Sequence, residues 1–337
     1  MKDIFINKKT WQTFTEAEMN EYIQKVFNYY RKNGFPYFNS DKIFRDKEFL
    51  KTKKYDFKNV IDKENKTIKQ TMHGLSLAWS YMPHSWEIIC GNKKTPFEVF
   101  HNDELFIKVI EKRIKMGDNI SDNGIRKMLK LFTGTQSVSN FRPTAAAAIY
   151  SLFCKEGDTV WDFSSGFGGR LIGAELAKVN YIGTDPSTLT YNGLIELKKD
   201  YIKSIKSEIH KLGSEEFKPK EKSIDFIFTS PPYFNWEKYS NEETQSYKKF
   251  SSKEEWINGY LFKTFQNCHY GLKDNSYMAI NIANISIFKT LEDETIKVAE
   301  EAGFKLIDTW KLALSNPNMK NKASSFKYEP IYIFKKI

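Results

Sequence analysis

From about Val138 to the C-terminus, short apolar runs alternate with stretches of helical periodicity. The apolar runs lie at 159–161, 181–183, 224–228, 277–282, 305–310 and 331–334, and the helical stretches lie at 169–178, 189–206, 253–270 and 292–302. Strands that alternate with helices form a parallel sheet with helices on both faces. The sequence therefore predicts an α/β fold with a doubly wound, Rossmann-like sheet, whose ligands bind at the carboxyl ends of the strands.

The N-terminal part of the chain has a different texture, with many aromatic residues and little strand-like alternation. Thr15 and Glu18 form the pattern of a capping box, and apolar residues then follow at helical spacing as far as Asn33-Gly34. Further helices are predicted over 97–116 and 122–132. We therefore divide the chain into a mainly helical N-terminal region, residues 1–137, and an α/β domain, residues 138–337.

The charge of the chain favours an anionic partner. There are 52 Lys and Arg residues against 42 Asp and Glu, which gives a formal net charge of +10. Residues 41–69 interleave lysines with aromatic side chains, a mixture that suits a nucleic-acid surface. A solvated face whose aromatic side chains enter a small core explains the same mixture equally well. The N-terminal region is thus a candidate for target recognition.

Several classes of protein find no support in the sequence. Cys90, Cys154 and Cys268 are far apart and odd in number, so they predict neither a disulfide framework nor a zinc cluster. The five histidines form no ligand-spaced pair, and we expect no metal. We also expect no membrane segment, because no run approaches the roughly 18 consecutive apolar residues that a spanning helix needs. These features predict a cytoplasmic protein.

A glycine-rich turn follows the first strand of the α/β domain, at residues 162–170. Glycine allows the backbone of such a turn to approach a bound ligand closely, although any tight strand-to-helix connection also favours it. No P-loop pattern is present, whereas the Gly166-x-Gly168 spacing is shared with dinucleotide folds. Asp185 follows the next strand, where its carboxylate can accept hydrogen bonds from both hydroxyls of a ribose. The pattern predicts a nucleoside cofactor without specifying which one.

The buried strand at 223–229 stops abruptly at the tetrad Ser230-Pro231-Pro232-Tyr233. Two consecutive prolines cannot donate to a sheet ladder, so the simplest structural interpretation is a strand end with a rigid turn. The same tetrad also has a chemical interpretation.

Over residues 138–336 the sequence resembles the amino-methyltransferases of DNA, whose catalytic motif is (Asp/Asn/Ser)-Pro-Pro-(Tyr/Phe). The resemblance implies a Rossmann-like methyltransferase sheet and transfer of a methyl group from S-adenosylmethionine to an exocyclic amino group of a flipped base in double-stranded DNA. Serine in the first position favours cytosine N4, with adenine N6 as the alternative. The implied catalytic residues are Ser230, Pro231, Pro232 and Tyr233.

The same resemblance implies a set of residues around S-adenosylmethionine. The segment that packs around the methionine part, the glycine-rich loop, the ribose acid and the third-strand end that meets the adenine each contribute. They are Asn140, Phe141, Arg142 and Thr144; Asp162, Ser164, Gly166, Gly168 and Gly169; Asp185; and Ser214 and Glu215.

The chemistry explains why these residue types suit an amine target. The lone pair of an exocyclic amine is delocalised into the ring, and it is localised if the Ser230 hydroxyl and the Pro231 carbonyl both accept N–H bonds from the amine. Proline holds that carbonyl rigidly, and Tyr233 stacks on the flipped base. The sequence shows no strong general base near the tetrad, and none is required once the nitrogen is cationic. Methylation at cytosine C5 would instead need a cysteine nucleophile, which the motif does not supply.

One departure from the family concerns recognition of the target. No long insertion follows Gly169 or Tyr233, so recognition is expected from the first 130 residues or from modest loops such as 234–252. Two alternatives stay open: an RNA methyltransferase, and a catalytically idle DNA-binding module on the same fold.

Overall fold

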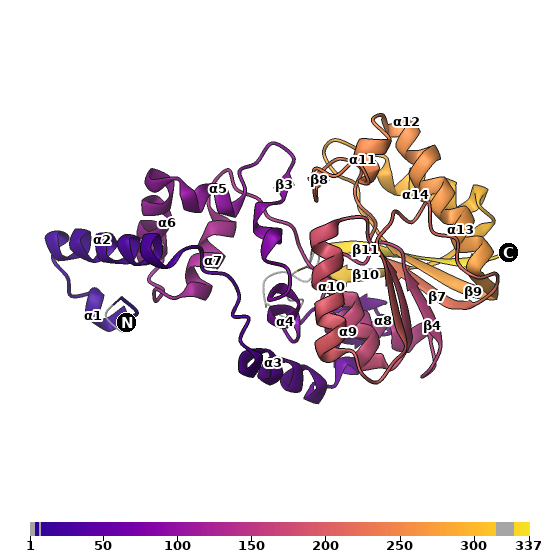
Figure 1. Cartoon of the computed structure of the whole chain (residues 1–337), viewed down its shortest axis with the longest axis horizontal. Coiled ribbons are helices and arrows are strands. Elements are labelled where there is room, and N and C mark those ends of the chain that lie inside the picture. The colour runs from indigo at the N-terminus through magenta and orange to yellow at the C-terminus, as the bar shows by residue number, and fades with distance from the viewer. Residues whose placement is uncertain (1–3, 7, 315–326) are drawn as a thin grey trace. The chain divides into compact units, whose positions relative to one another are not determined.

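The structure is a computed structural model of the chain and describes residues 4–6, 8–314 and 327–337 (Figure 1). The chain divides into two compact units, each of which we describe separately. The helical unit comprises residues 1–39 and 83–139, and the α/β unit comprises residues 40–82 and 140–337. No described helix has both the length and the apolar composition needed to cross a membrane.

The helical unit is built mainly from helices around an aromatic core. The capping box of Thr15 and Glu18 is confirmed, and Tyr30 at the centre of this core donates a hydrogen bond of 2.9 Å to Asp122. The helix expected over 97–116 is two helices, because the Asn102 side chain caps a new helix there by accepting from the Leu105 N–H. The elements are α1 (Lys8–Trp11), α2 (Glu16–Asn33), η2 (Pro83–Glu87), β3 (Ile89–Cys90), α5 (Pro96–His101), α6 (Asp103–Lys115) and α7 (Asp122–Leu131).

The α/β unit contains a sheet in the order β1-β2-β10-β11-β9-β7-β4-β5-β6. The strands β6, β5, β4, β7 and β9 run parallel, whereas β11 is antiparallel to both of its neighbours, β9 and β10. The sheet therefore grows in opposite directions from β4 and β7, which confirms the predicted doubly wound α/β fold. The strands are β1 (Ile61–Asp62), β2 (Thr67–Ile68), β4 (Thr159–Asp162), β5 (Asn180–Thr184), β6 (Ser207–His210), β7 (Ile224–Thr229), β9 (Leu272–Asn281), β10 (Phe304–Ala313) and β11 (Tyr328–Lys336).

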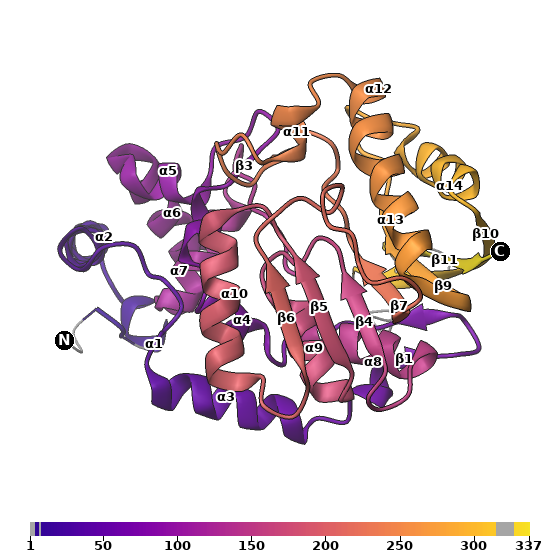
Figure 2. The same cartoon turned by 45° about the vertical axis from the view of Figure 1, so that its right-hand side comes forward.

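Helices cover both faces of this sheet (Figure 2). On one face, Phe153 of α8 stacks on Phe226 of β7 with ring centroids 5.0 Å apart. On the other face, Ile227 joins a buried cluster with Phe265 of α13. Alternate residues of β7 thus enter different cores, as the two-residue period of a strand requires. The helices and remaining elements are α8 (Pro143–Phe153), α9 (Gly169–Ala177), α10 (Thr188–Tyr201), β8 (Glu237–Lys238), α11 (Ser246–Lys249), α12 (Lys253–Glu255), η3 (Trp256–Phe262), α13 (Lys263–Gly271) and α14 (Leu291–Glu301).

Residues 40–82 lie in the α/β unit, whereas the predicted division between residues 137 and 138 placed them in the N-terminal region. They contain α3 (Lys42–Lys54), η1 (Phe57–Val60), β1, β2 and α4 (Leu75–Trp79), and they belong to the α/β unit. Backbone pairing is the reason: Thr67 and Ile68 of β2 extend the sheet beside β10. The Tyr201 hydroxyl also donates to Asp46 over 2.7 Å, which ties α3 to α10. The basic and aromatic stretch 41–69 therefore lies in the α/β unit.

A truncation of Phe226 tests the core beneath the tetrad. We expect Phe226→Ala to lower the free energy of unfolding by about 3–5 kcal/mol, because it leaves a cavity against Phe153. The measurement is urea denaturation. As a control, Leu189→Ala removes a side chain that is 58% exposed and should change stability by less than about 0.5 kcal/mol. Equal effects of the two changes would contradict this description of the core.

Candidate active site

The glycine-rich loop after β4 is held by a buried ion pair. Asp162 is fully buried at the end of β4, and one of its oxygens accepts from Arg170 Nε over 2.8 Å and from the Tyr181 hydroxyl over 2.7 Å. The other accepts from Thr229 Oγ1 over 2.7 Å and from the Ser164 N–H. Each carboxylate oxygen thus has two protein donors, so Asp162, a predicted cofactor residue, holds the loop from beneath.

Glycine is favoured at two positions of this loop, for a different physical reason at each. A Cβ at Gly169 would lie 1.8 Å from the Phe141 carbonyl oxygen, so the close approach of helix α9 to residue 141 requires glycine. Gly166 has φ of +55°, and a Cβ there would meet no atom nearer than 3.7 Å. Gly166 therefore provides the positive φ of the turn and is not required by close packing.

Asp185, the predicted ribose acid, lies against the same loop. Its carboxylate accepts from the backbone N–H groups of Gly166 and Ser187, each over 3.0 Å. Burial raises the pKa of Asp185 to about 7, although these two hydrogen bonds lower it. The structure thus brings the loop after β4 and the acid after β5 together, as their places on adjacent parallel strands predict.

The third element of the predicted cofactor site follows β6. The Ser214 hydroxyl lies 2.9 Å from Thr264 Oγ1, and Glu215 accepts from Lys249 Nζ over 2.7 Å with one oxygen. The other oxygen, Oε2, is buried and has no hydrogen-bond partner among the described residues. An unused buried acceptor suits a ligand that brings a donor, such as the amino group of an adenine.

Tyr260 is a site residue that the sequence did not indicate. Its buried hydroxyl lies 3.2 Å from Ser164 Oγ and also hydrogen-bonds to Ser214, so it joins the glycine-rich loop to the third-strand end. Tyr260 belongs to η3, a π-helical stretch, and such stretches often occur at functional sites. The sequence predicts only a helix over 253–270, because apolar spacing does not reveal a local change of helical pitch.

Residues 140–144, at the start of α8, contact two different neighbours. Asn140 Nδ2 donates to the Phe167 carbonyl over 3.0 Å, and Phe141 packs against Gly169, so both residues lie at the glycine-rich loop. In contrast, Arg142 Nε donates to Gln70 over 3.1 Å, and the Thr144 hydroxyl lies 2.8 Å from that of Thr71. The side chains of Arg142 and Thr144 are therefore directed to residues 70–71 and not to the loop.

The tetrad begins where β7 ends. The Thr229 hydroxyl that binds Asp162 immediately precedes Ser230, and Ser230 and Tyr233 share a hydrogen bond between their side chains. The Ala283 backbone N–H also bonds to the Tyr233 hydroxyl. Burial raises the pKa of Tyr233 well above its usual range, so the phenol is neutral. The tetrad thus directly follows Thr229, whose hydroxyl donates to the Asp162 carboxylate that holds the glycine-rich loop.

Residues 237–252 lie along the cofactor side of this region. Glu242 accepts from the backbone N–H and the hydroxyl of Thr188, the first residue of α10, and the Thr244 hydroxyl donates to the Pro186 carbonyl over 3.2 Å. Lys249 reaches Glu215 after β6. These residues belong to the 234–252 loop, a sequence candidate for target recognition, and are therefore attached to the segments that follow β5 and β6.

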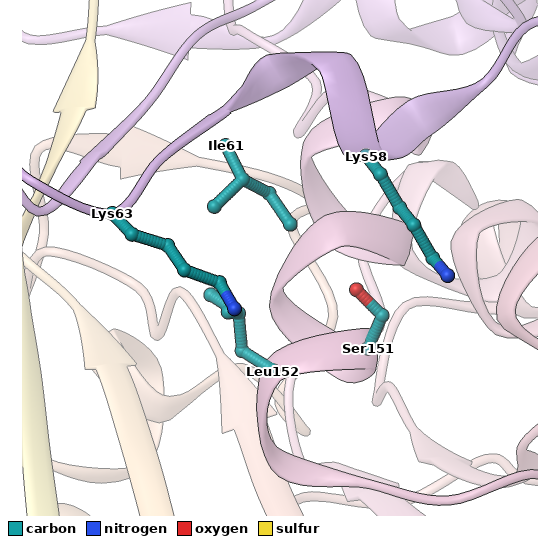
Figure 3. Close-up of a pocket in the computed structure, with 5 residues that line it drawn as sticks. All are labelled: Lys58, Ile61, Lys63, Ser151 and Leu152. Atoms are coloured by element: carbon teal, nitrogen blue, oxygen red, sulfur yellow. The ribbon is translucent and has the colours of Figure 1, made fainter.

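A separate hollow lies elsewhere in the α/β unit (Figure 3). It has a volume of about 430 Å³ and is lined by Lys58, Ile61, Lys63, Ser151 and Leu152. Ser151 lies eight residues, about 12 Å of helix, from the start of α8 at Pro143. The hollow contains no predicted site residue and is distinct from the region around the tetrad. The described residues contain no group of three or more side chains that suits a metal ion.

The elements of the predicted site lie at one edge of the sheet. A doubly wound sheet carries a glycine-rich loop, the acid Asp185 and a Ser-Pro-Pro-Tyr strand end, all at the carboxyl ends of neighbouring strands. Residues 224–337 match the family model described as DNA methylase. This match covers the C-terminal third of the chain, includes the tetrad and supports the predicted resemblance to the amino-methyltransferases.

Three solved structures that are similar to this chain are described as methyltransferases. A TehB-like SAM-dependent methyltransferase from Corynebacterium glutamicum is 15% identical with a TM-score of 0.38, over 59% of this chain and 90% of that one. A SAM-dependent O-methyltransferase from Thermotoga maritima is 15% identical with a TM-score of 0.41, over 59% and 67%. A SAM-dependent methyltransferase from Aquifex aeolicus is 16% identical with a TM-score of 0.40, over 57% and 89%. A comparison with curated protein sequences gives no match.

The buried ion pair makes a testable contribution to stability. We expect Arg170→Met to lower the free energy of unfolding by about 3–5 kcal/mol, because it leaves the Asp162 carboxylate buried without its cation. Chemical denaturation measures this change. Lys222→Met, which breaks the exposed ion pair with Asp274, is the control and should leave stability almost unchanged. If the two substitutions have the same effect, Asp162 and Arg170 do not anchor the loop.

Proposed function

We propose that this protein is an S-adenosylmethionine-dependent DNA methyltransferase. Its target is the exocyclic amino group of a flipped base in double-stranded DNA, with cytosine N4 favoured over adenine N6. The observation that carries the proposal is the shared anchor at Asp162. The same carboxylate holds the glycine-rich loop through Arg170 and the start of the tetrad through Thr229, so the two halves of a transfer site have a common fixed point.

The residues around the loop suit this cofactor. Asp185 offers a carboxylate to the ribose hydroxyls, and the unused Oε2 of Glu215 offers an acceptor to the adenine amine. Tyr260, Ser164 and Ser214 add hydroxyl groups between these two acids. When bound, S-adenosylmethionine supplies a methyl group whose bond to sulfur breaks with its electron pair remaining on sulfur.

The tetrad then prepares the target amine. Ser230 Oγ and the Pro231 carbonyl accept its N–H bonds and localise its lone pair. A Ser230 hydroxyl that donates to Tyr233 keeps its own lone pairs for this purpose. Proline fixes the φ of the backbone and so holds the carbonyl in place. The Tyr233 ring stacks on the flipped base and offsets part of the few kcal/mol that flipping costs.

The charge distribution supports a nucleic-acid partner. The chain has a net charge of +10, and residues 40–82 alone contain ten Lys and Arg residues against six Asp and Glu. Such a concentration of cations favours contact with phosphates. The description of the matching family names DNA, which favours DNA over RNA as the substrate.

Product analysis tests this function directly. We expect the protein to transfer label from methyl-labelled S-adenosylmethionine to unmethylated genomic DNA and to yield N4-methylcytosine on digestion to nucleosides and mass spectrometry. Ser230→Ala should still bind the cofactor but transfer methyl groups at least about 100-fold more slowly, because one acceptor of the amine is lost.

The other outcomes each identify a different function. N6-methyladenine would reassign the target base and keep the mechanism. Label in RNA alone would replace the DNA enzyme with an RNA methyltransferase. No transfer to either polymer, with cofactor binding intact, would indicate an idle binding module.

The pKa of Asp185 predicts a pH dependence of cofactor binding. Because burial raises this pKa to about 7, the carboxyl is mostly protonated at pH 6 and mostly ionised at pH 8. Only the ionised form can accept from both ribose hydroxyls, so we expect the affinity for S-adenosylmethionine to fall about tenfold from pH 8 to pH 6. Calorimetry measures this affinity. Asp185→Asn should bind more weakly and without that slope; a pH-independent affinity of the wild type would contradict the ribose role.

A further inference from the structure

Glu329 is a carboxyl side chain near the tetrad that the reaction described so far does not use. It lies at the start of β11, opposite Leu312 of β10. In the pairing of β11 with β9, Ile331 lies opposite Asn281, and in the parallel pairing of β7 with β9, Thr229 lies beside Ile280. Ser230 and Asn281 directly follow Thr229 and Ile280, so they are neighbours across β7 and β9. Glu329 precedes Ile331 by two residues in the antiparallel strand β11, so it lies beyond Asn281 at this edge of the sheet.

Side-chain contacts connect Glu329 to the tetrad. Asn281 Nδ2 donates to the Pro330 carbonyl over 2.9 Å, and the Asn281 side chain also hydrogen-bonds to the Glu329 carboxylate. Ala283, two residues beyond Asn281, donates its backbone N–H to the Tyr233 hydroxyl. The same short stretch after β9 thus contacts both Glu329 and Tyr233.

In the part of the chain that the structure describes, no cation is paired with Glu329. From the tetrad loop, Glu237 and the Tyr233 phenol face it, and the charge of Glu329 raises the pKa of both. From β9 it meets the neutral amide of Asn281. From β10, the Lys311 ammonium lies over the Tyr328 ring, 5.3 Å from its centroid. Among the described residues, burial raises the pKa of Glu329 and only the Asn281 hydrogen bond lowers it.

A carboxylate in such surroundings is a stronger base than one in an ion pair. The cofactor-side acid Glu215 is paired with Lys249, and Asp162 is paired with Arg170. Among the described residues, Glu329 is thus an acid without a paired cation, and the stretch after β9 that contacts it also contacts Tyr233 of the tetrad.

We propose that Glu329 is a further catalytic residue, the proton acceptor for the target amine. This inference rests on the proposed function. As the new N–C bond forms, positive charge develops on the nitrogen, and the Glu329 carboxylate stabilises it. An N–H bond then breaks, its electron pair stays on the nitrogen, and the proton moves to a carboxylate oxygen of Glu329. Glu329 later releases that proton to water.

The experiment is single-turnover methyl transfer to DNA by Glu329→Gln and by the wild type, between pH 5 and pH 9. Saturating S-adenosylmethionine removes the pH effect of Asp185 on affinity. We expect the wild-type rate to rise with pH as Glu329 ionises and then to level off. Glu329→Gln should be about 100-fold slower at the plateau and should lack the acidic limb, since an amide neither titrates nor accepts a proton.

Two further variants distinguish this role from a structural one. Glu329→Asp keeps a carboxylate and should retain the acidic limb at a reduced rate; it carries the test if Glu329→Gln does not fold. Glu237→Gln removes a neighbouring negative charge, which lowers the pKa of Glu329, and should therefore move the acidic limb to lower pH. Cofactor calorimetry and thermal melting identify the variants that are folded.

The outcomes separate this inference from the function on which it rests. A folded Glu329→Gln with the wild-type rate and the wild-type acidic limb overturns the role of Glu329 and leaves the methyltransferase assignment intact. A wild type that transfers no methyl group to DNA overturns the proposed function, and the role of Glu329 with it.

Discussion

The buried pair of Asp162 and Arg170 is the interaction on which the site depends. In a region of low dielectric an unpaired carboxylate would be costly, so Asp162 must be surrounded by donors. Those donors come from four different elements: Arg170 from α9, the Tyr181 hydroxyl from β5, the Thr229 hydroxyl from β7 and the Ser164 backbone from the loop itself. One charge therefore fixes the relative positions of the loop, two neighbouring strands and the start of the tetrad. Any movement of one element would leave part of the carboxylate unsatisfied, so this constraint favours a preorganised site.

The two prolines impose a second constraint at the same edge. β7 lies between β4 and β9 in the middle of the sheet, where both neighbours require backbone donors. A strand in that position must end where its donors end, and Pro231 and Pro232 fix that point. The tetrad follows directly after Thr229, whose hydroxyl donates to Asp162. The two prolines thus end β7 and also determine where the tetrad begins.

The sequence predicted the features that depend on local pattern. The alternation after Val138 indicated the doubly wound sheet, and the spacing of Asp162, Gly166 and Asp185 correctly placed the loop beside the second acid, since adjacent parallel strands end at one edge. What depends on distant pairing was missed. Residues 40–82 join the α/β unit through the ladder between β2 and β10, and Arg142 is directed to Gln70 for the same reason. Tyr260 reaches Ser164 from a π-helical stretch, and Asn102 ends one helix by capping another. Neither event leaves a signal in apolar periodicity.

The pairing of the acidic residues also suits the direction of the reaction that we propose. On the cofactor side, the acids already have donors: Asp185 has two backbone N–H groups, and Glu215 has Lys249. These carboxylates can bind neutral hydroxyl and amino groups without attracting excess positive charge. On the tetrad side, Glu329 and Glu237 repel each other and have no cation among the described groups that shift their pKa. Methyl transfer moves positive charge from the sulfur to the target nitrogen. In the proposed site this charge therefore moves toward Glu329 and Glu237, the acids without a paired cation in the described part of the chain. This distribution of charge favours methyl transfer from sulfur to nitrogen. It arises because the fold pairs Glu215 with a lysine and leaves Glu329 and Glu237 without a cation among the described residues.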